Sequence, residues 1–233
     1  MAPVLALLYD VHGNLPALEA VLADADAQGA RRFLLGGDYA LFGAWPAETL
    51  ARLEALPDAT WIRGNVDRWL TEPPEGAGQP AEGAIPPCRE ALGAGAIERL
   101  FGLAEQTVIG DTRYCHASPV SDLRSFLPDP LPEDVELLAD VREPRLVFGH
   151  THLAFTRTAE GPHGPVELVN PGSVGMPLDG DHRAAYALRH DDGRIEHRRV
   201  AYDHMASAAA LRERFGDAEW VSIIAGRLER ARL

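Results

Sequence analysis

Aspartate, asparagine and histidine side chains follow a series of short apolar segments in this sequence. Oxygen and nitrogen donors of these types suit borderline divalent metals such as Mn, Fe, Zn, Co and Ni. In α/β sheets the ends of strands collect ligand sites, because the loops there converge on one crevice. The recurrence therefore predicts a metal centre. The polar residues at these strand ends are Asp10, His12, Asp38, Asn65, Asp67, His116, His150 and His152.

A purely structural explanation exists for each of these residues taken alone. Asp10, Asp38 and Asn65 can act as helix caps and turn formers, and the histidines can satisfy hydrogen bonds in a core. A single Asp-x-His is weak evidence, because short motifs often occur by chance. These explanations do not account for ligand types recurring beside glycines at one predicted strand end after another. We therefore favour the metal centre.

The N-terminal part of the chain predicts a β-loop-α-β unit that positions the first ligands. An apolar run over residues 4–9 is followed by a helical segment that Asn14 can cap and Gly29 can end. A second apolar run over residues 33–35 leads into Gly36-Gly37-Asp38. Such a unit implies parallel strands joined by a right-handed crossover.

The remaining elements alternate at first and then become mostly antiparallel. Gly110-Asp111 is a tight hairpin signal whose second strand delivers His116, and Asp192-Gly193 joins a later pair. Helices are expected over residues 46–56 and after about 203. The predicted later strands are residues 60–63, 107–109, 113–115, 146–148, 154–158, 166–169, 184–189 and 194–201.

We expect one domain over residues 1–233, an α/β sandwich with four αββα layers. Two mixed β-sheets pack face to face, helices cover their outer faces, and the metals lie at one end. Residues 71–87 are rich in Pro, Gly, Glu and Ala and read as a long loop or insertion that overhangs the site. The sequence does not indicate an oligomeric state.

Composition excludes several classes of protein. The formal charge of -13 argues against a long nucleic acid as partner, because such binding uses basic contacts to phosphates. No apolar run approaches the length of a membrane span, and no signal-peptide pattern is present, so we expect a cytoplasmic protein without a membrane partner. Cys88 and Cys115 are expected to be free thiols.

The ordered motifs resemble those of the calcineurin-like metallophosphoesterases, and the similarity covers most of the chain. A later loop, 170–175, is similar to one in the small bacterial and archaeal phosphodiesterase branch of that family. The motifs that carry the resemblance are Asp10-Val11-His12-Gly13-Asn14, Gly37-Asp38, Gly64-Asn65-Val66-Asp67, His116, Gly149-His150-Thr151-His152 and Asn170-Pro171-Gly172-Ser173-Val174-Gly175.

The resemblance implies two metal sites and assigns their ligands. Asp10, His12 and His152 would hold one ion, and the Asp38 carboxylate would bridge to the other. The second ion would be held by Asn65, His116 and His150. A carboxylate can bridge because it has two oxygens, whereas an amide or imidazole normally offers one donor atom to one metal.

The implied activity is metal-dependent hydrolysis of phosphate esters, as a phosphodiesterase or phosphomonoesterase. Two ions about 3.5 to 4 Å apart can share a hydroxide, which attacks phosphorus in line. Mn is the favoured metal, and Asp38, Asn65 and His116 would serve catalysis directly. Arg63 could add a donor to the phosphate, although a surface ion pair is an equal alternative. The substrate would be small and phosphorylated, and nucleotide-derived esters are included.

The chain departs from the family at Val66, where the fuller motif has a histidine that protonates the leaving oxygen. A general acid contributes about 10² to 10⁴ in rate, so esters with acidic leaving groups should be preferred. His182 is a minor candidate for a replacement acid. Asp67 could orient His116 or His150, or could form a turn or cap.

Three aromatic residues follow Asp38 in the sequence. Tyr39, Phe42 and Trp45 could wall a substrate pocket, although we expect at least two of them to pack in the core.

Other functions share parts of this pattern. A dinucleoside polyphosphate hydrolase or a protein phosphatase would use the same metals in a longer groove. A non-catalytic, metal-stabilised binding module is motivated by Val66, but the complete ligand set argues against it.

Overall fold

Two five-stranded mixed sheets form the centre of the molecule in the computed structural model, which describes residues 4–76 and 78–233. The first sheet has the order β10-β9-β1-β2-β3, in which β1, β2 and β3 are parallel and β9 is antiparallel to both of its neighbours. Its strands are β1 (Val4–Leu8), β2 (Ala30–Leu35), β3 (Ala59–Trp61), β9 (Ala184–Arg189) and β10 (Ile195–Val200).

The second sheet has the order β4-β5-β6-β8-β7. Its central strand β6 is parallel to both β5 and β8, while β4 and β7 lie antiparallel at the edges. The prediction of a mostly antiparallel second half is wrong at β6, because the β5–β6 and β6–β8 connections are crossovers rather than hairpins. Its strands are β4 (Gln106–Ile109), β5 (Thr112–Cys115), β6 (Arg145–Val147), β7 (Phe155–Gly161) and β8 (Gly164–Asn170).

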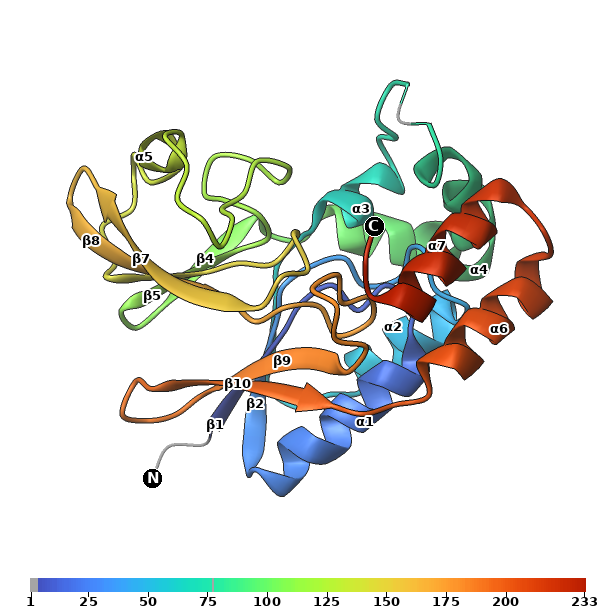
Figure 1. The fold of residues 1–233 in the computed structure, drawn as a ribbon, viewed down its shortest axis with the longest axis horizontal. Helices are drawn as coiled ribbons and strands as arrows, with labels where there is room; N and C mark the ends of the chain where they lie inside the picture. The colour runs from blue at the N-terminus through green and yellow to red at the C-terminus, as the bar shows by residue number, and fades with distance from the viewer. Residues whose placement is uncertain (1–3, 77) are drawn as a thin grey trace.

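Alternation of side chains along β1 explains how the layers are held together. Leu5 and Leu7 belong to a buried cluster with Tyr114 and Val147 of the second sheet. The intervening residues of β1 face the helices and belong to a separate, larger cluster. Helices cover the outer face of the first sheet (Figure 1), and the predicted αββα sandwich is confirmed. The layer on the second sheet is thin, since its helix α5 (Asp134–Leu137) is short.

The first helix begins where its capping residue predicts. Asn14 accepts a hydrogen bond from the Ala17 amide and caps α1, as expected. The helices are α1 (Leu15–Ala27), α2 (Pro46–Glu54), α3 (Asn65–Trp69), α4 (Ala81–Phe101), α6 (His204–Phe215) and α7 (Glu219–Arg230).

The predicted loop over residues 71–87 is wrong in its second half, because α4 begins at Ala81. Proline and glycine in this stretch suggested a loop, but Ala84, Ile85 and Cys88 are buried at helical spacing. The helix packs against α3 and α7, and burial of this stripe outweighs the poor helix propensity of the segment. Residues 71–76 and 78–80 contain no helix or strand.

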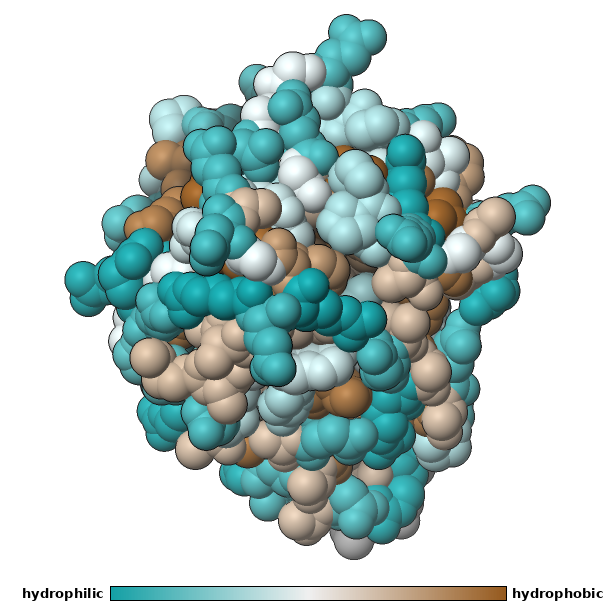
Figure 2. Space-filling view, turned by 90° about the vertical axis from the view of Figure 1, so that its right-hand side faces the viewer, coloured by the Kyte–Doolittle hydropathy of each residue, from teal (hydrophilic) through white to brown (hydrophobic). Residues whose placement is uncertain are grey.

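The surface over the C-terminal helices carries no single dominating apolar area; small hydrophobic groups are scattered among hydrophilic residues there (Figure 2). Of the helices in the described part of the chain, none combines the length and hydropathy needed to cross a membrane. Both cysteines, Cys88 and Cys115, are free thiols, as predicted, and both are buried.

Candidate metal centre

The seven candidate ligands come from five loops at one edge of the two sheets. Loops after β1 and β2 supply Asp10, His12 and Asp38, and Asn65 is the first residue of α3, just after β3. Parallel strands end at the same edge, so the loops after them meet. Strands β5 and β6 are likewise parallel, and the loops after them supply His116, His150 and His152.

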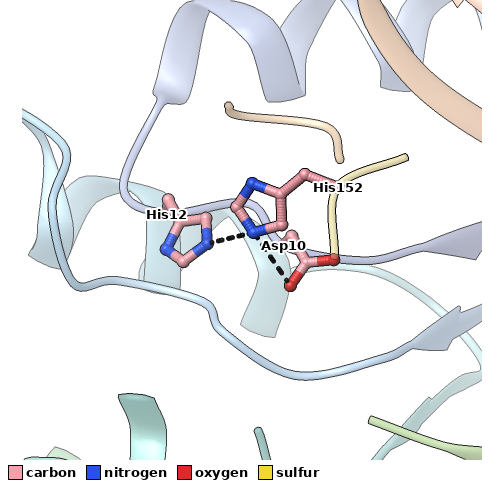
Figure 3. A group of neighbouring side chains, drawn as sticks. All are labelled: Asp10, His12 and His152. Carbon is pink, nitrogen blue, oxygen red and sulfur yellow. Dashed lines mark hydrogen bonds and ion pairs between the residues drawn. The ribbon is translucent and has the colours of Figure 1, made fainter. Parts of the chain in front are cut away.

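The first group of donor atoms comprises Asp10, His12 and His152 (Figure 3). Nε2 of His12 lies 3.1 Å from Nε2 of His152. That nitrogen of His152 lies 3.5 Å from Oδ1 of Asp10. All three residues are buried. Three donor atoms of metal-ligand type thus point at one small volume.

A second group forms around the side-chain oxygen of Asn65. This Oδ1 lies 2.9 Å from Nε2 of His116 and 2.9 Å from Nδ1 of His150. The two imidazole rings meet edge to face, with centroids 5.3 Å apart. Asn65, His116 and His150, which the resemblance assigns to one ion, are therefore brought together.

Asp38 lies between the two groups. Its Oδ2 is 3.8 Å from Nε2 of His12 in the first group and 3.4 Å from Nε2 of His116 in the second. Its Oδ1 accepts a hydrogen bond from the Val66 amide at 3.0 Å. The carboxylate oxygen that faces both groups is therefore Oδ2.

The hydrogen bonds around the site show that it suits cations. Nδ1 of His12 donates to the Leu41 carbonyl, and Nδ1 of His152 donates to the Met176 carbonyl. In the neutral rings Nε2 then carries a lone pair directed at the site. Oδ1 of Asp10 is buried and has no hydrogen-bond partner among the residues that the structure describes. Acceptors that face one another in a buried space are costly unless a cation lies between them.

Backbone strain is concentrated at these ligands. Five of them have positive φ: Asp10 (56°), His12 (49°), Asp38 (61°), His150 (67°) and His152 (60°). Left-handed residues other than glycine are uncommon and persist only where the surroundings hold them, which is typical of functional sites. The ligand loops are therefore held in a conformation that the chain would not adopt by itself.

Glycines permit the close approach of the ligand loops. A Cβ atom on Gly64 would lie 2.1 Å from Oδ1 of Asp38, and one on Gly149 would lie 2.5 Å from Oδ2 of Asp10. Neither position has room for a side chain. The Gly-Asn and Gly-His motifs thus let the loops contact the carboxylates directly.

The Asp67 carboxylate accepts hydrogen bonds from backbone amides rather than from imidazoles. Its Oδ2 accepts hydrogen bonds from the amides of Asp38 and Gly64, each at 2.8 Å, and its Oδ1 accepts one from the Tyr39 amide at 3.1 Å. The idea that it orients His116 or His150 is wrong, and the alternative of a cap is right. The fully buried carboxylate joins the loop after β2 to the start of α3.

The carboxylates and imidazoles shift one another's pKa values. Burial lowers the pKa of His116, but the charges of Asp38 and Asp10 outweigh it and raise this pKa to about 10. Burial raises the pKa of Asp38, but His116 more than offsets it and holds this pKa below its usual range. Burial and the charge of a neighbouring histidine lower the pKa of His12 and of His150 to about 4. The metal-free site therefore keeps its positive charge on His116.

Metal binding at pH 8 should consequently release a proton from His116. A nitrogen ligand must lose its proton to bind a metal, and the raised pKa leaves His116 protonated at this pH. We expect close to one proton per protein from this residue. Calorimetric titration of the metal-free protein with Mn in buffers of different ionisation enthalpy measures it. A His116→Asn variant should lose this release, and a heat independent of the buffer would contradict the prediction.

A pocket of about 530 Å³ opens over the metal-ligand residues. It lies between the segment that follows β5 and the helices α3, α4 and α7, which Figure 1 shows on opposite sides of the strand ends. Among the described residues that line it, Arg227 of α7 is the single lysine or arginine. The lining residues are His12, Asp38, Phe42, Asn65, Val66, Trp69, Pro80, Ala81, Leu123, Ser125, Leu127, Leu131, His150, Thr151, His152, Met176, Leu178, Arg227 and Leu233.

Arg63 lies beside a neighbouring pocket, which it shares with His116. Its guanidinium donates to the Phe101 carbonyl at 2.7 Å and pairs with Glu105 at 2.6 Å. Arg63 thus forms the ion pair that we expected as the alternative to a phosphate contact. Sequence reasoning missed Arg227, because nothing beside it in the sequence marks it as a site residue.

As expected, two of the three aromatic residues after Asp38 pack in or against the core. Phe42 lines the pocket, whereas Tyr39 is buried and its hydroxyl lies within hydrogen-bond distance of two backbone carbonyls. Trp45 packs against the core. His182 does not line the pocket; its ring stacks on that of His204 at 4.3 Å. The structure therefore gives no support to His182 as a general acid.

Comparisons with known proteins agree with this geometry. Residues 4–193 match the family model of the calcineurin-like phosphoesterase superfamily domain. An uncharacterized protein of Methanocaldococcus jannaschii is 28% identical over 219 residues, which cover 86% of this chain and 88% of the relative.

Two crystal structures match nearly the whole fold. A metallophosphoesterase from Sphaerobacter thermophilus has a TM-score of 0.81 at 25% identity, with 99% of this chain and 100% of that chain covered. A hypothetical protein from Pyrococcus horikoshii OT3 has a TM-score of 0.79 at 20% identity, with 95% and 97% covered.

Proposed function

This chain belongs to the calcineurin-like phosphoesterase superfamily and is a hydrolase of phosphoric esters, and from that premise we propose that it cleaves small phosphate esters at a two-metal centre. One observation carries the proposal: two groups of buried donor atoms meet on either side of Oδ2 of Asp38. The first ion would be held by Asp10, His12 and His152. The second would be held by Asn65, His116 and His150, with Asp38 common to both.

Bound divalent ions supply a water-derived nucleophile near neutral pH and neutralise charge on the phosphate. The protein's own part is to fix the donors in place. One oxygen of Asp10 accepts from the His150 amide at 3.0 Å, and one oxygen of Asp38 accepts from the Val66 amide. One oxygen of each carboxylate is thus held by a backbone amide, and the other oxygen would be available to bind a metal ion. Mn, Fe, Zn, Co and Ni all accept this mixture of oxygen and nitrogen ligands, and among them we propose Mn.

The leaving group should determine the rate strongly. Val66 is buried in the pocket wall where the fuller family motif carries a proton donor. Among the described residues that line the pocket, the only imidazole and carboxylate side chains are those of the proposed ligands. We therefore propose that the departing oxygen leaves with little protonation by the protein, which favours aryl esters, phosphoanhydrides and nucleotide diesters over simple alkyl esters.

A series of esters tests both parts of this function. The Mn-loaded protein should hydrolyse p-nitrophenyl esters, and kcat should fall about 10²-fold or more when the aryl leaving group is replaced by an alkyl one. Chelation with EDTA should abolish turnover, and Mn should restore it. Equal rates for aryl and alkyl esters would overturn the leaving-group proposal. Absence of Mn-dependent hydrolysis of every ester, including dinucleoside polyphosphates and phosphopeptides, would overturn the enzymatic function.

A further inference from the structure

Leucines line part of the pocket that contains the metal-ligand residues. Leu123, Leu127 and Leu131 come from the segment between β5 and α5, and Leu178 comes from the loop before β9. We call these four residues the leucine wall. Leu123 is 47% exposed and Leu127 is 38% exposed. Large apolar side chains left in water at the mouth of a functional pocket indicate a ligand that covers them.

Further apolar residues extend the wall toward the ligands. Phe42, Val66 and Met176 line the same pocket and are almost fully buried. Leu178 packs against the core cluster that contains these three residues, so apolar lining reaches from Leu178 of the leucine wall to the metal-ligand residues. A ligand whose phosphate reaches the metals would place its organic group on this surface.

The charged side chains of the pocket also favour a substrate with little charge beyond its phosphate. Arg227 is the single positive side chain among its described lining residues. The structure records no ion pair or hydrogen bond of its guanidinium within residues 4–76 and 78–233, and desolvation lowers its pKa. One cation suits a substrate with a single phosphate group. The pocket therefore narrows the acidic leaving groups named above to those of aryl and other apolar esters, because a phosphoanhydride or polyphosphate chain would place further charges against leucines, which is unfavourable.

We propose that the pocket selects phosphate esters with a large apolar organic group, which the leucine wall covers. The proposal rests on the proposed function, since the phosphate is taken to lie at the metal centre, and it adds the substrate class. The occupant is the substrate itself, because the wall is part of the pocket that contains His12, His150 and His152.

Alkylphosphonates test this selection without depending on which ester is hydrolysed. They cannot be cleaved as esters, so their inhibition constants report binding whether the substrate is a monoester or a diester. Each fully buried methylene contributes about fourfold in affinity, so hexylphosphonate should inhibit at least about tenfold more strongly than methylphosphonate. Equal inhibition constants would overturn the proposal.

Substitution of the wall identifies where the alkyl chain binds. In a Leu123→Ser/Leu127→Ser variant the ratio of the two inhibition constants should fall to about one third of the wild-type ratio or less. Both side chains are partly exposed, so their loss leaves no core cavity. Val108→Ser is the matched control, because Val108 is 47% exposed on β4 and outside the pocket. Its ratio should equal that of the wild type.

Two failures can be told apart. A wild-type ratio that persists in the Leu123→Ser/Leu127→Ser variant would overturn the leucine wall as the binding surface and leave the esterase function intact. Mn-dependent hydrolysis of the reporter ester is required before any inhibition can be measured, so its absence would overturn the proposed function instead.

Discussion

An Asp38→Asn variant should lose about a thousandfold or more in kcat at saturating Mn, because bound metals contribute several kcal/mol to stabilisation of the transition state. Asparagine keeps an oxygen for the Val66 amide, which donates to Oδ1 of Asp38. It replaces Oδ2, the atom that faces both groups of donors, with an uncharged amide. An amide cannot supply the negative charge that two adjacent cations need between them.

Steady-state kinetics and metal analysis together check this result. The variant should retain fewer than two Mn ions per chain after dialysis, while its circular dichroism should match that of the wild type. Asp58→Asn is a matched control, since Asp58 pairs with Arg32 at the surface and lies outside the pocket. Its kcat should stay within about twofold, as expected for a screened surface pair. Wild-type activity in Asp38→Asn would refute the two-metal proposal.

The clustering of the candidate ligands could be predicted from the sequence because each of them lies within five residues after the end of a strand. Parallel strands bring their carboxyl ends to one edge, so a local pattern is enough to predict a long-range cluster. This rule on strand ends did not predict the strand pairing of the second sheet. The pairing of β6 with β5 and β8 depends on crossovers whose geometry no short motif encodes.

The partner of Asp67 and the leucine wall could not be predicted, for a common physical reason. Asp67 accepts hydrogen bonds from backbone amides, and backbone amides are the same at every residue. The leucines of the wall lie in two irregular segments, where no period of two or 3.6 relates spacing to a face. Both features become visible only when loops from distant parts of the chain are placed side by side.

Helix α4 shows how tertiary packing can override a composition signal. Pro86 and Pro87 lie in its first turns, and Gly93 has a φ of 73° where the helix is kinked. Local propensity alone disfavours a helix there. The buried stripe of the segment supplies the missing stabilisation, and α4 then contributes Pro80 and Ala81 at its start to the pocket.

Asp67→Asn should destabilise the Mn-loaded protein by about 2 to 4 kcal/mol, although it changes the shape of the side chain very little. The carboxylate accepts three backbone amide hydrogens, from Asp38, Gly64 and Tyr39. Asparagine has one accepting oxygen, and its NH₂ group would face at least one of these amides. A buried donor would then meet a donor instead of an acceptor, with no water to replace the lost bond.

Relief of the repulsion between Asp67 and Asp38 opposes this loss of stability, and the size of that relief depends on whether metal is bound. Burial and the charge of Asp38 raise the pKa of Asp67 to about 7, so a neutral asparagine relieves repulsion in the metal-free protein. Bound cations already compensate that repulsion, and the full cost should therefore appear only with Mn present. Urea unfolding in EDTA and in Mn measures the two values. Asp122→Asn removes the partner of Arg68, a partly exposed pair, and should cost no more than about 1 kcal/mol in either condition. A loss for Asp67→Asn no larger than this control would show that Asp67 does not hold the two ligand loops together.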